Sequence, residues 1–156
     1  MANKKNLWGM LVMVLVFGMT VVGCGEKEEE KGNGNIPGGG KFTLTGIPST
    51  YNGMYALFAS GWDAKDLILF GAQSVSSFTK YTAARISNGS VTLTLWKATN
   101  DVISGYTGND TVIGQVMIFE KMNDDEEPAI LCDFSSITFT NGNATKTWSE
   151  GTTTTP

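Results

Sequence analysis

Residues 86–95, with the sequence ISNGSVTLTL, decide the fold class of this 156-residue chain. Asn88-Gly89 separates two short runs that favour strands, and an Asn-Gly pair favours a two-residue type I′ turn because both central positions need positive φ. After the turn, Val91, Leu93 and Leu95 alternate with threonines, which is typical of a strand with one buried and one wet face. The segment therefore predicts a tight antiparallel hairpin.

The same pattern of short strands and turns continues along the chain from Lys41. Asn141-Gly142 predicts a second tight hairpin, and residues 48–53 predict another turn because Pro presets φ and Asn-Gly tolerates positive φ. No segment after Lys41 keeps a 3.6-residue apolar period, so any helix should be short, near residues 63–65 or 74–80. The predicted strands are 42–47, 54–60, 67–72, 82–86, 90–97, 111–121, 129–140 and 144–149, with a bulge or bend near Ser135-Ser136 in the seventh.

Eight strands joined by hairpins favour a closed arrangement, because closure removes exposed sheet edges. We therefore predict an all-β fold, a single small antiparallel up-and-down β-barrel, with a two-sheet β-sandwich as the alternative. Residues 54–59 and 67–72 are apolar on both faces of their strands. This two-sided pattern indicates an apolar cavity, a covering loop or a protein interface.

The N-terminus has the layout of an export signal. Lys4 and Lys5 precede an apolar run over residues 7–22, which is shorter than the roughly 20 residues of a membrane-spanning helix. The sequence Val21-Val22-Gly23-Cys24 that ends the run resembles the bacterial lipoprotein signal. The resemblance implies that residues 1–23 are removed and that Cys24 becomes the lipidated first residue, with palmitate-type acyl chains. A retained membrane span, or Cys24 as an ordinary apolar residue, is the alternative.

The segment after Cys24 reads GEKEEEKGNGNIPGGG and has no apolar periodicity. We expect residues 24–40 to form a flexible, disordered acidic and Gly-rich tether, residues 41–151 the β-barrel domain, and residues 152–156 a disordered tail. With roughly 20 to 25 Å of reach, the tether would let the domain stand clear of the lipid headgroups. The expected location is the bacterial cell envelope, on the outer membrane or the periplasmic face of a membrane.

Composition excludes most familiar activities. The chain has no His, which removes Ser-His-Asp and Cys-His catalysis and the commonest metal ligand. It carries 11 basic against 15 acidic residues, and 9 against 15 after signal removal, without a Lys/Arg cluster, so nucleic acid is not an expected partner. We predict no enzyme activity, catalytic residue, metal or cofactor, and expect contact with the membrane through the acyl chains on Cys24.

Carboxylates leave two alternatives open. Catalysis would need acids to converge in space, and the candidates are Asp63, Asp66, Asp110, Glu120 and Asp133. Asn100-Asp101 and Asn109-Asp110 are turn residues that also carry cation-binding oxygens, whereas the acidic run over residues 124–127 is expected as a solvated loop because contiguous acids do not wrap a cation.

Several segments resemble small spirochaete-type bacterial lipoproteins of unknown function. They are TGIPSTYNGMYA (45–56), ISNGSV (86–91), YTGNDT (106–111) and residues 137–148, and together they span most of the domain. The resemblance implies a lipoprotein and brings no activity with it. Gly53-Met54-Tyr55 is also similar to the lipocalin start, Gly-x-Trp, which gives an alternative function as a carrier of a small apolar ligand.

Loop aromatics beside Gly and Asn form a recognition composition, so Tyr51, Tyr106, Asn109 and Asp110 are the candidate binding residues. In a meander the connections alternate ends, which places 48–53, 75–81, 98–110 and 141–142 at the membrane-distal end. Residues 61–66, 88–89 and 122–128 are then placed near the tether. We expect an envelope or extracellular partner at the distal loops. The alternative is that each of these loop aromatics packs over a barrel end. Trp96 and Trp148, which lie within predicted strands, are expected as packing residues.

Cys132 lies in the apolar run over residues 129–132. With Cys24 lipidated it has no disulfide partner in the chain, and we expect a buried small apolar residue rather than a reactive thiol.

Overall fold

The structure, a computed structural model, describes residues 38–60, 68–74, 81–99, 102–121 and 127–156. Two 3₁₀ turns, η1 (Ser49–Tyr51) and η2 (Trp148–Glu150), accompany the strands. The strands are β1 (Lys41–Thr45), β2 (Tyr55–Ser60), β3 (Ile68–Ser74), β4 (Tyr81–Thr82), β5 (Ala84–Arg85), β6 (Val91–Thr99), β7 (Val102–Gly105), β8 (Thr111–Phe119), β9 (Ile130–Thr138), β10 (Ala144–Thr147) and β11 (Thr152–Thr154).

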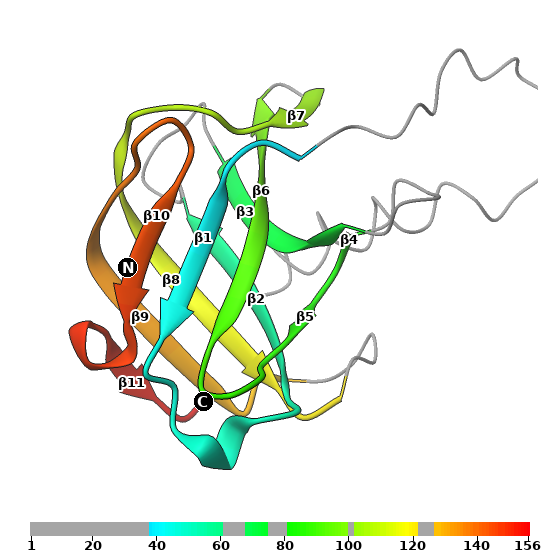
Figure 1. The fold of residues 1–156 in the computed structure, drawn as a ribbon, viewed down its shortest axis with the longest axis vertical. Helices are drawn as coiled ribbons and strands as arrows, with labels where there is room; N and C mark the ends of the chain where they lie inside the picture. Colours follow the sequence, from blue (N-terminus) through cyan, green and yellow to red (C-terminus); the bar gives the residue numbers. More distant parts are fainter. Residues whose placement is uncertain (1–37, 61–67, 75–80, 100–101, 122–126) are drawn as a thin grey trace, which may run out of the picture.

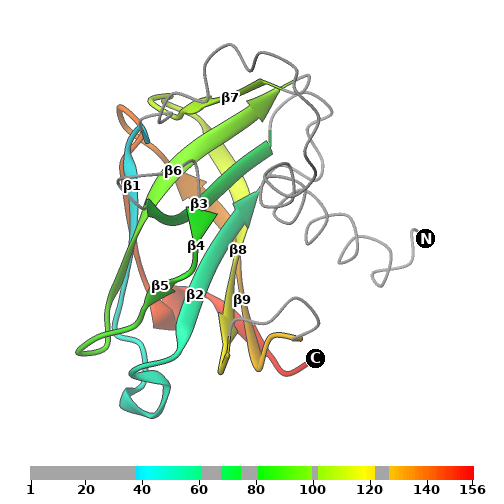
Figure 2. The ribbon, with the colours of Figure 1, turned by 90° about the vertical axis from the view of Figure 1, so that its right-hand side faces the viewer.

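The strands form one strongly curled sheet, a half-barrel, in the order β10-β1-β6-β3-β2-β8-β9-β11 (Figure 1). Three short strands pair off this path: β4 with β3, β5 with β2 and β7 with β6. The view turned by 90° shows the curl of the sheet (Figure 2). The all-β class and the barrel-like fold are therefore confirmed. The predicted short helices near 63–65 and 74–80 fall largely outside the described residues.

Local turn chemistry is confirmed at both Asn-Gly pairs. Asn88 and Gly89 have φ of 50° and 67°, and Asn141 and Gly142 have φ of 50° and 77°. The flanking bridges, Ser87 to Ser90 and Thr140 to Asn143, make both turns two-residue hairpins. The sequence therefore specified these two reversals by itself, because few residues other than Gly and Asn accept positive φ.

The bulge predicted in β9 is also present. Val112 of β8 pairs with Ile137 and Gly114 pairs with Phe134, so one residue of β8 lies opposite Ser135 and Ser136. Both serines are exposed, whereas Phe134 and Ile137 are buried. The extra residue lets β9 turn both large side chains inward while the curled sheet bends around them.

The strand order differs from an up-and-down meander. Strand β1 lies between β6 and β10 rather than beside β2, and its pairing with β10 is parallel. The segment predicted as strand 82–86 forms the short strands β4 and β5, and β5 runs antiparallel to β2, as β3 does. The chain therefore runs in the same direction along β3 and β5, whereas the meander predicts opposite directions for these two segments. Every predicted strand after β5 consequently runs opposite to its expected direction.

The predicted ends of the domain need two further corrections. The last five residues were expected as a disordered tail, but β11 pairs antiparallel with residues 131–133 of β9. The predicted strand 144–149 stops at Thr147, where η2 begins. Thr147 and Glu150 form a capping box there: the Thr147 side chain accepts the Glu150 N–H, and the Glu150 carboxylate accepts the Thr147 N–H. After η2 the chain crosses from β10 to the edge of β9, where β11 pairs.

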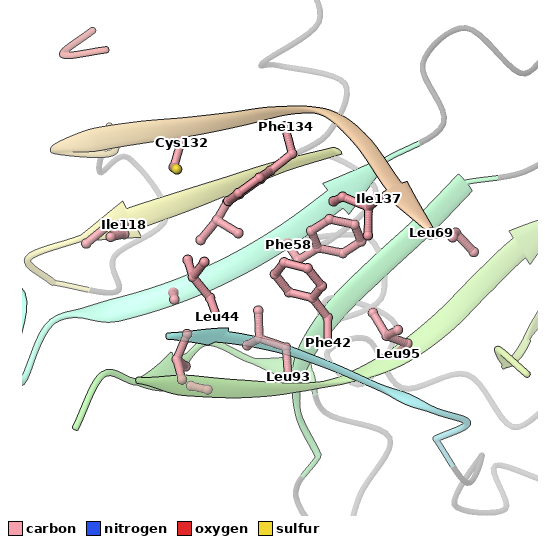
Figure 3. Close-up of a cluster of buried hydrophobic side chains, with 14 of the residues drawn as sticks. Phe42, Leu44, Phe58, Leu69, Leu93, Leu95, Ile118, Cys132, Phe134 and Ile137 are labelled. Atoms are coloured by element: carbon pink, nitrogen blue, oxygen red, sulfur yellow. The ribbon is translucent and has the colours of Figure 1, made fainter. Parts of the chain in front are cut away.

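The inside of the curled sheet is filled by a core that is rich in aromatic rings (Figure 3). Phe42 stacks on Phe58 with ring centroids 4.8 Å apart, and Phe134 meets Phe42 edge-on at 6.2 Å. Val91, Leu93 and Leu95 point into this core, as the alternation in β6 predicts. Large side chains thus take up the space that a ligand cavity would need.

A second apolar cluster lies on the outer face of the sheet, and it accounts for the strands that are apolar on both sides. Its buried members are Leu57, Ala59, Phe70, Ala72, Ala83, Trp96, Met117 and Phe119. Phe70 and Trp96 stack at 5.8 Å, and Ile103 of β7 packs against the cluster. Trp96 is therefore a packing residue, as predicted.

Candidate functional site

The described part of the predicted tether is bound to the domain. Gly39 N–H donates to the carbonyl of Leu95 at 2.9 Å, and Gly40 N–H donates to that of Tyr106 at 2.6 Å. Leu95 N–H donates back to the Gly40 carbonyl at 3.0 Å. The prediction of a free tether up to Gly40 is therefore wrong for residues 39 and 40. We call the end of the barrel where they join it the tether end.

Three chain segments cross at the tether end at backbone-to-backbone distance. A Cβ added to Gly39 would lie 2.0 Å from the Tyr106 carbonyl oxygen, and one added to Gly40 would lie 2.0 Å from that of Gly142. One added to Gly142 would lie 2.4 Å from the same Tyr106 oxygen. Glycine is required at this crossing because any side chain would push the three backbones apart.

Tyr106 is a packing residue of this crossing, only 2% exposed. Its ring meets Phe139 edge-on at 5.3 Å, and its hydroxyl donates to Asp110 Oδ2 at 2.7 Å while accepting the Asp110 N–H at 3.3 Å. Burial, with the bond to Asp110 second, raises the pKa of Tyr106 to about 12. The phenol is thus held neutral and hydrogen-bonded, and its hydroxyl is engaged within the loop.

Asn109 and Asp110 bind the loop to the β9–β10 hairpin. Asn109 Oδ1 accepts the N–H of Asn141 at 2.7 Å, and the Asp110 carbonyl accepts that of Phe139 at 2.8 Å. Gly142 N–H donates to the Gly108 carbonyl at 2.7 Å. Tyr106, Asn109 and Asp110 are therefore brought together, but their polar groups bond to one another and to the hairpin. We conclude that they stabilise the tether end.

Tyr51 lies at the opposite end, which we call the distal end. There the N–H of Ile47 donates to the carbonyl of Gly89 at 2.9 Å, and Gly89 N–H donates to Asn52 Oδ1 at 2.9 Å. The turn that follows β1 is thus hydrogen-bonded to the Asn88-Gly89 hairpin. The predicted meander places these two turns at opposite ends of the domain.

The placement of Tyr51 and Tyr106 at one end is therefore wrong, and the same direction change explains each misplaced connection. Because β3 and β5 run the same way, the Asn88-Gly89 turn, the end of β8 and the start of β9 belong to the distal end. The loop over 102–110 and the Asn141-Gly142 turn belong to the tether end.

Two half-buried aromatic side chains meet at the distal end. Tyr51 of η1 and Trp148 of η2 have ring centroids 5.6 Å apart and planes inclined by 41°. The sequence had assigned Trp148 to a strand interior, although Thr147-x-x-Glu150 carries the signal of a helical N-terminus. Tyr51 thus keeps its candidate role, and Trp148 joins it.

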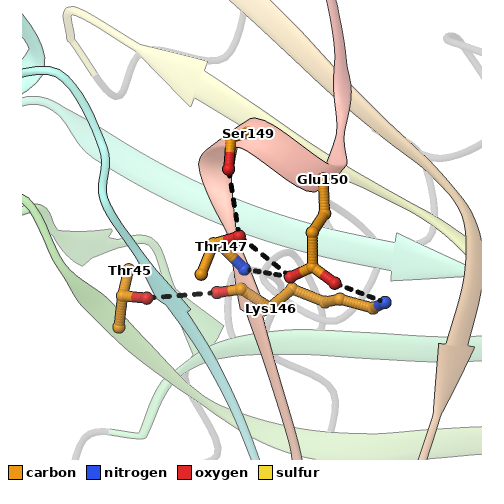
Figure 4. A network of polar contacts seen from close by, with 5 residues as sticks. All are labelled: Thr45, Lys146, Thr147, Ser149 and Glu150. Atoms are coloured by element: carbon orange, nitrogen blue, oxygen red, sulfur yellow. Dashed lines mark hydrogen bonds and ion pairs between the residues drawn. The ribbon is translucent and has the colours of Figure 1, made fainter.

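A polar network supports η2 and the position of Trp148 (Figure 4). Glu150 accepts the Thr147 N–H at 2.6 Å and forms an ion pair with Lys146 at 3.1 Å. The bond from the Thr147 N–H, with that from Lys146, lowers the pKa of the Glu150 carboxyl. Thr45 Oγ1 donates to the Lys146 carbonyl at 3.4 Å, which joins β10 to β1.

The acidic candidates do not converge where the structure describes them. Asp110 is at the tether end, Glu120 follows β8 at the distal end, and Asp133 on β9 accepts a bond from Gln115 Nε2 at 2.6 Å. Across the described ranges no group of three or more metal-ligating side chains occurs. Several other candidates lie outside the described residues: Cys24, Asp63, Asp66, residues 100–101 and most of the acidic run 124–127.

Cys132 is free and fully buried, as predicted. Burial, with the charge of Asp133 second, raises the pKa of its thiol to about 12. A thiol that stays protonated is a weak nucleophile, so Cys132 acts as a small core residue.

Comparison with known proteins adds no family. No protein-family model matches the chain, and neither curated proteins nor solved structures give a match. Among the described residues, no helix is long and apolar enough to cross a membrane.

Proposed function

We propose that this chain is a lipid-anchored domain of the bacterial envelope that acts without catalysis, by presenting its distal end to an envelope or extracellular partner. The observation that carries the proposal is the position of the tether. The chain joins the domain at one end, and the half-buried pair of Tyr51 and Trp148 lies at the other. A domain held through Cys24 would turn that pair away from the lipid.

The chemistry of the distal end suits recognition of another molecule. Tyr51 and Trp148 supply rigid, amphipathic area, and Ser49, Thr50 and Asn52 beside them are exposed polar residues. Aromatic side chains next to small polar ones make adaptable contacts at low cost in side-chain entropy. Both aromatics also rest on the main core, which fixes their position before any partner arrives.

The alternative function, a carrier of a small apolar ligand, has less support. In the described chain, the inside of the curled sheet holds Phe42 against the rings of Phe58, Phe134 and Phe139. A ligand of ordinary size needs a pocket of about 300 Å³ or more, which would require these rings to move apart. The packing therefore favours binding on the surface.

The anchor is tested by metabolic labelling with an alkyne-bearing fatty acid in the natural host. The parent should incorporate the label and fractionate with membranes, whereas Cys24→Ala should do neither. Cys132→Ala is the matched control, because it removes the other cysteine of the chain and should leave labelling intact. Label retained in Cys24→Ala would refute the anchor.

The presenting end is tested by photo-crosslinking in intact cells. A crosslinking amino acid replaces Thr50 at the distal end or Thr107 at the tether end; both positions are exposed. We expect a crosslinked partner from position 50, lost when Tyr51→Ala is added. A partner captured from position 107 alone would reverse the assignment of the ends.

A further inference from the structure

Two large apolar side chains stand out as exposed among the described residues, Val102 at 64% and Ile113 at 51%. Both lie at the tether end. Val102 pairs with Thr99, the last residue of β6, and Ile113 precedes Gly114, which pairs with Ser60 at the end of β2. In Figure 1 the strand that begins at Val102, β7, lies at the end where β1 begins.

The fold leaves both side chains exposed to solvent. In β7 the neighbouring Ile103 packs on the outer cluster, so alternation along the strand points Val102 the other way. Ile113 lies at the irregular pairing between β8 and β9, and its carbonyl accepts a 2.7 Å bond from the buried Ser60 hydroxyl. The backbone at Ile113 is thus fixed while its side chain meets solvent.

We propose that Val102 and Ile113 contact the lipid surface to which the chain is anchored, and that this contact orients the domain with its distal end outward. The inference rests on the proposed lipid anchor. The chain leads to this end from Cys24, and the described part of it, Gly39 and Gly40, is bonded to the domain, so the tether end is the part of the domain nearest the lipid.

The occupant is a zwitterionic lipid surface. Lys41, Lys97 and Asp110 are the charged residues placed at this end in the described chain, a nearly balanced set that gives little attraction to anionic headgroups. Two side chains bind lipid only weakly when the domain is free in solution. The anchor raises the local concentration of lipid so far that a weak contact becomes populated.

The test places an environment-sensitive fluorophore on an introduced cysteine in the acylated full chain. Val102→Cys and Ile113→Cys probe the tether end, and Thr50→Cys is the distal control. Cys132 should not compete for the label, because it is buried with a raised pKa. Each protein, with acylation verified by intact mass, is reconstituted in vesicles of phosphatidylcholine or of phosphatidylcholine mixed with phosphatidylglycerol. Both kinds of vesicle are made with and without a lipid that carries a nitroxide quencher near the headgroup.

We expect the fluorophores at 102 and 113 to be quenched at least twofold more than the one at 50. Equal quenching at all three positions, with the acyl mass present, would overturn the lipid contact and leave the anchor standing. Quenching confined to vesicles with phosphatidylglycerol would overturn the zwitterionic contact. Absence of the acyl mass from host-purified protein would overturn the anchor and the contact together.

Discussion

Gly142→Ala should destabilise the domain much more than Gly53→Ala, although both glycines have positive φ, 77° and 87°. The backbone strain of an alanine in this region is shared by the two variants and costs about 1 to 2 kcal/mol. The surroundings differ. A Cβ at Gly53 has no neighbour within 4 Å, whereas one at Gly142 lies 2.4 Å from the Tyr106 carbonyl oxygen and 2.8 Å from Thr107 Cα.

The additional cost at Gly142 follows from the bonds that must give way. An ordinary contact distance requires the Tyr106–Thr107 backbone to move by about 1 Å. That movement strains the bond from Gly142 N–H to the Gly108 carbonyl, at 2.7 Å, and the bond from Gly40 N–H to the Tyr106 carbonyl, at 2.6 Å. With each bond worth about 0.5 to 1.5 kcal/mol, Gly142→Ala should cost about 1 to 3 kcal/mol more than Gly53→Ala.

The assay is urea unfolding of the chain without residues 1–24, monitored by tryptophan fluorescence. Gly46→Ala is a second control, because Gly46 has a φ of 68° and its nearest neighbour, Trp148 N, is 4.0 Å from the added Cβ. Gly46→Ala and Gly53→Ala should agree within about 0.5 kcal/mol. If Gly142→Ala agrees with them too, the three-segment crossing contributes nothing to stability and the reasoning fails.

Tyr106→Phe should lower stability by about 1 to 2 kcal/mol near neutral pH through loss of the bonds to Asp110. The pKa of Tyr106 is raised from 10.0 to about 12, so the stability linked to its proton is complete below pH 10 and lost as the pH rises to 12. Urea unfolding midpoints measured between pH 10 and 12 should therefore fall more steeply for the parent than for Tyr106→Phe. In the native protein at pH 9 to 10, Cys132 should not react with a thiol reagent, because its pKa is about 12. Unfolding in urea should expose one reactive thiol, and rapid reaction of Cys132 in the native protein would contradict its burial. Phe42→Ala should cost about 3 to 5 kcal/mol by emptying the core, while Thr145→Ala on the exposed face should cost less than about 1 kcal/mol, and similar unfolding midpoints would show that the aromatic core is not tightly packed.

The sequence by itself determined the features that depend on a few neighbouring residues. Asn88-Gly89 and Asn141-Gly142 form the predicted turns because positive φ is a property of the residues themselves. The alternation in β6 indicates which face of the strand is buried. Ser135-Ser136 indicates the bulge, because two consecutive polar residues between the inward-facing Phe134 and Ile137 break the alternation of the strand. The burial of Cys132 follows in the same way from the apolar run around it.

Only the tertiary structure decided which strands pair. The sequence of β1 is compatible with a hairpin with β2, but in the structure β1 lies between β6 and β10. Pairing partners are chosen by the whole core, where Phe42 must meet Phe58, Phe134 and Phe139 at once. One short segment, β4 and β5, then reversed the predicted direction of every later strand.

The candidate site shows the same division. Tyr51 and Tyr106 look alike in the sequence, as tyrosines in loops beside Gly and Asn. The fold buries Tyr106 at the three-segment crossing and leaves Tyr51 half-buried against Trp148 at the other end. Composition identifies residues able to bind, but burial depends on segments distant in sequence, here the glycines before β1 and the β9–β10 hairpin. For this reason the sequence predicted turns and strands, whereas only the packed structure assigned the two ends of the domain.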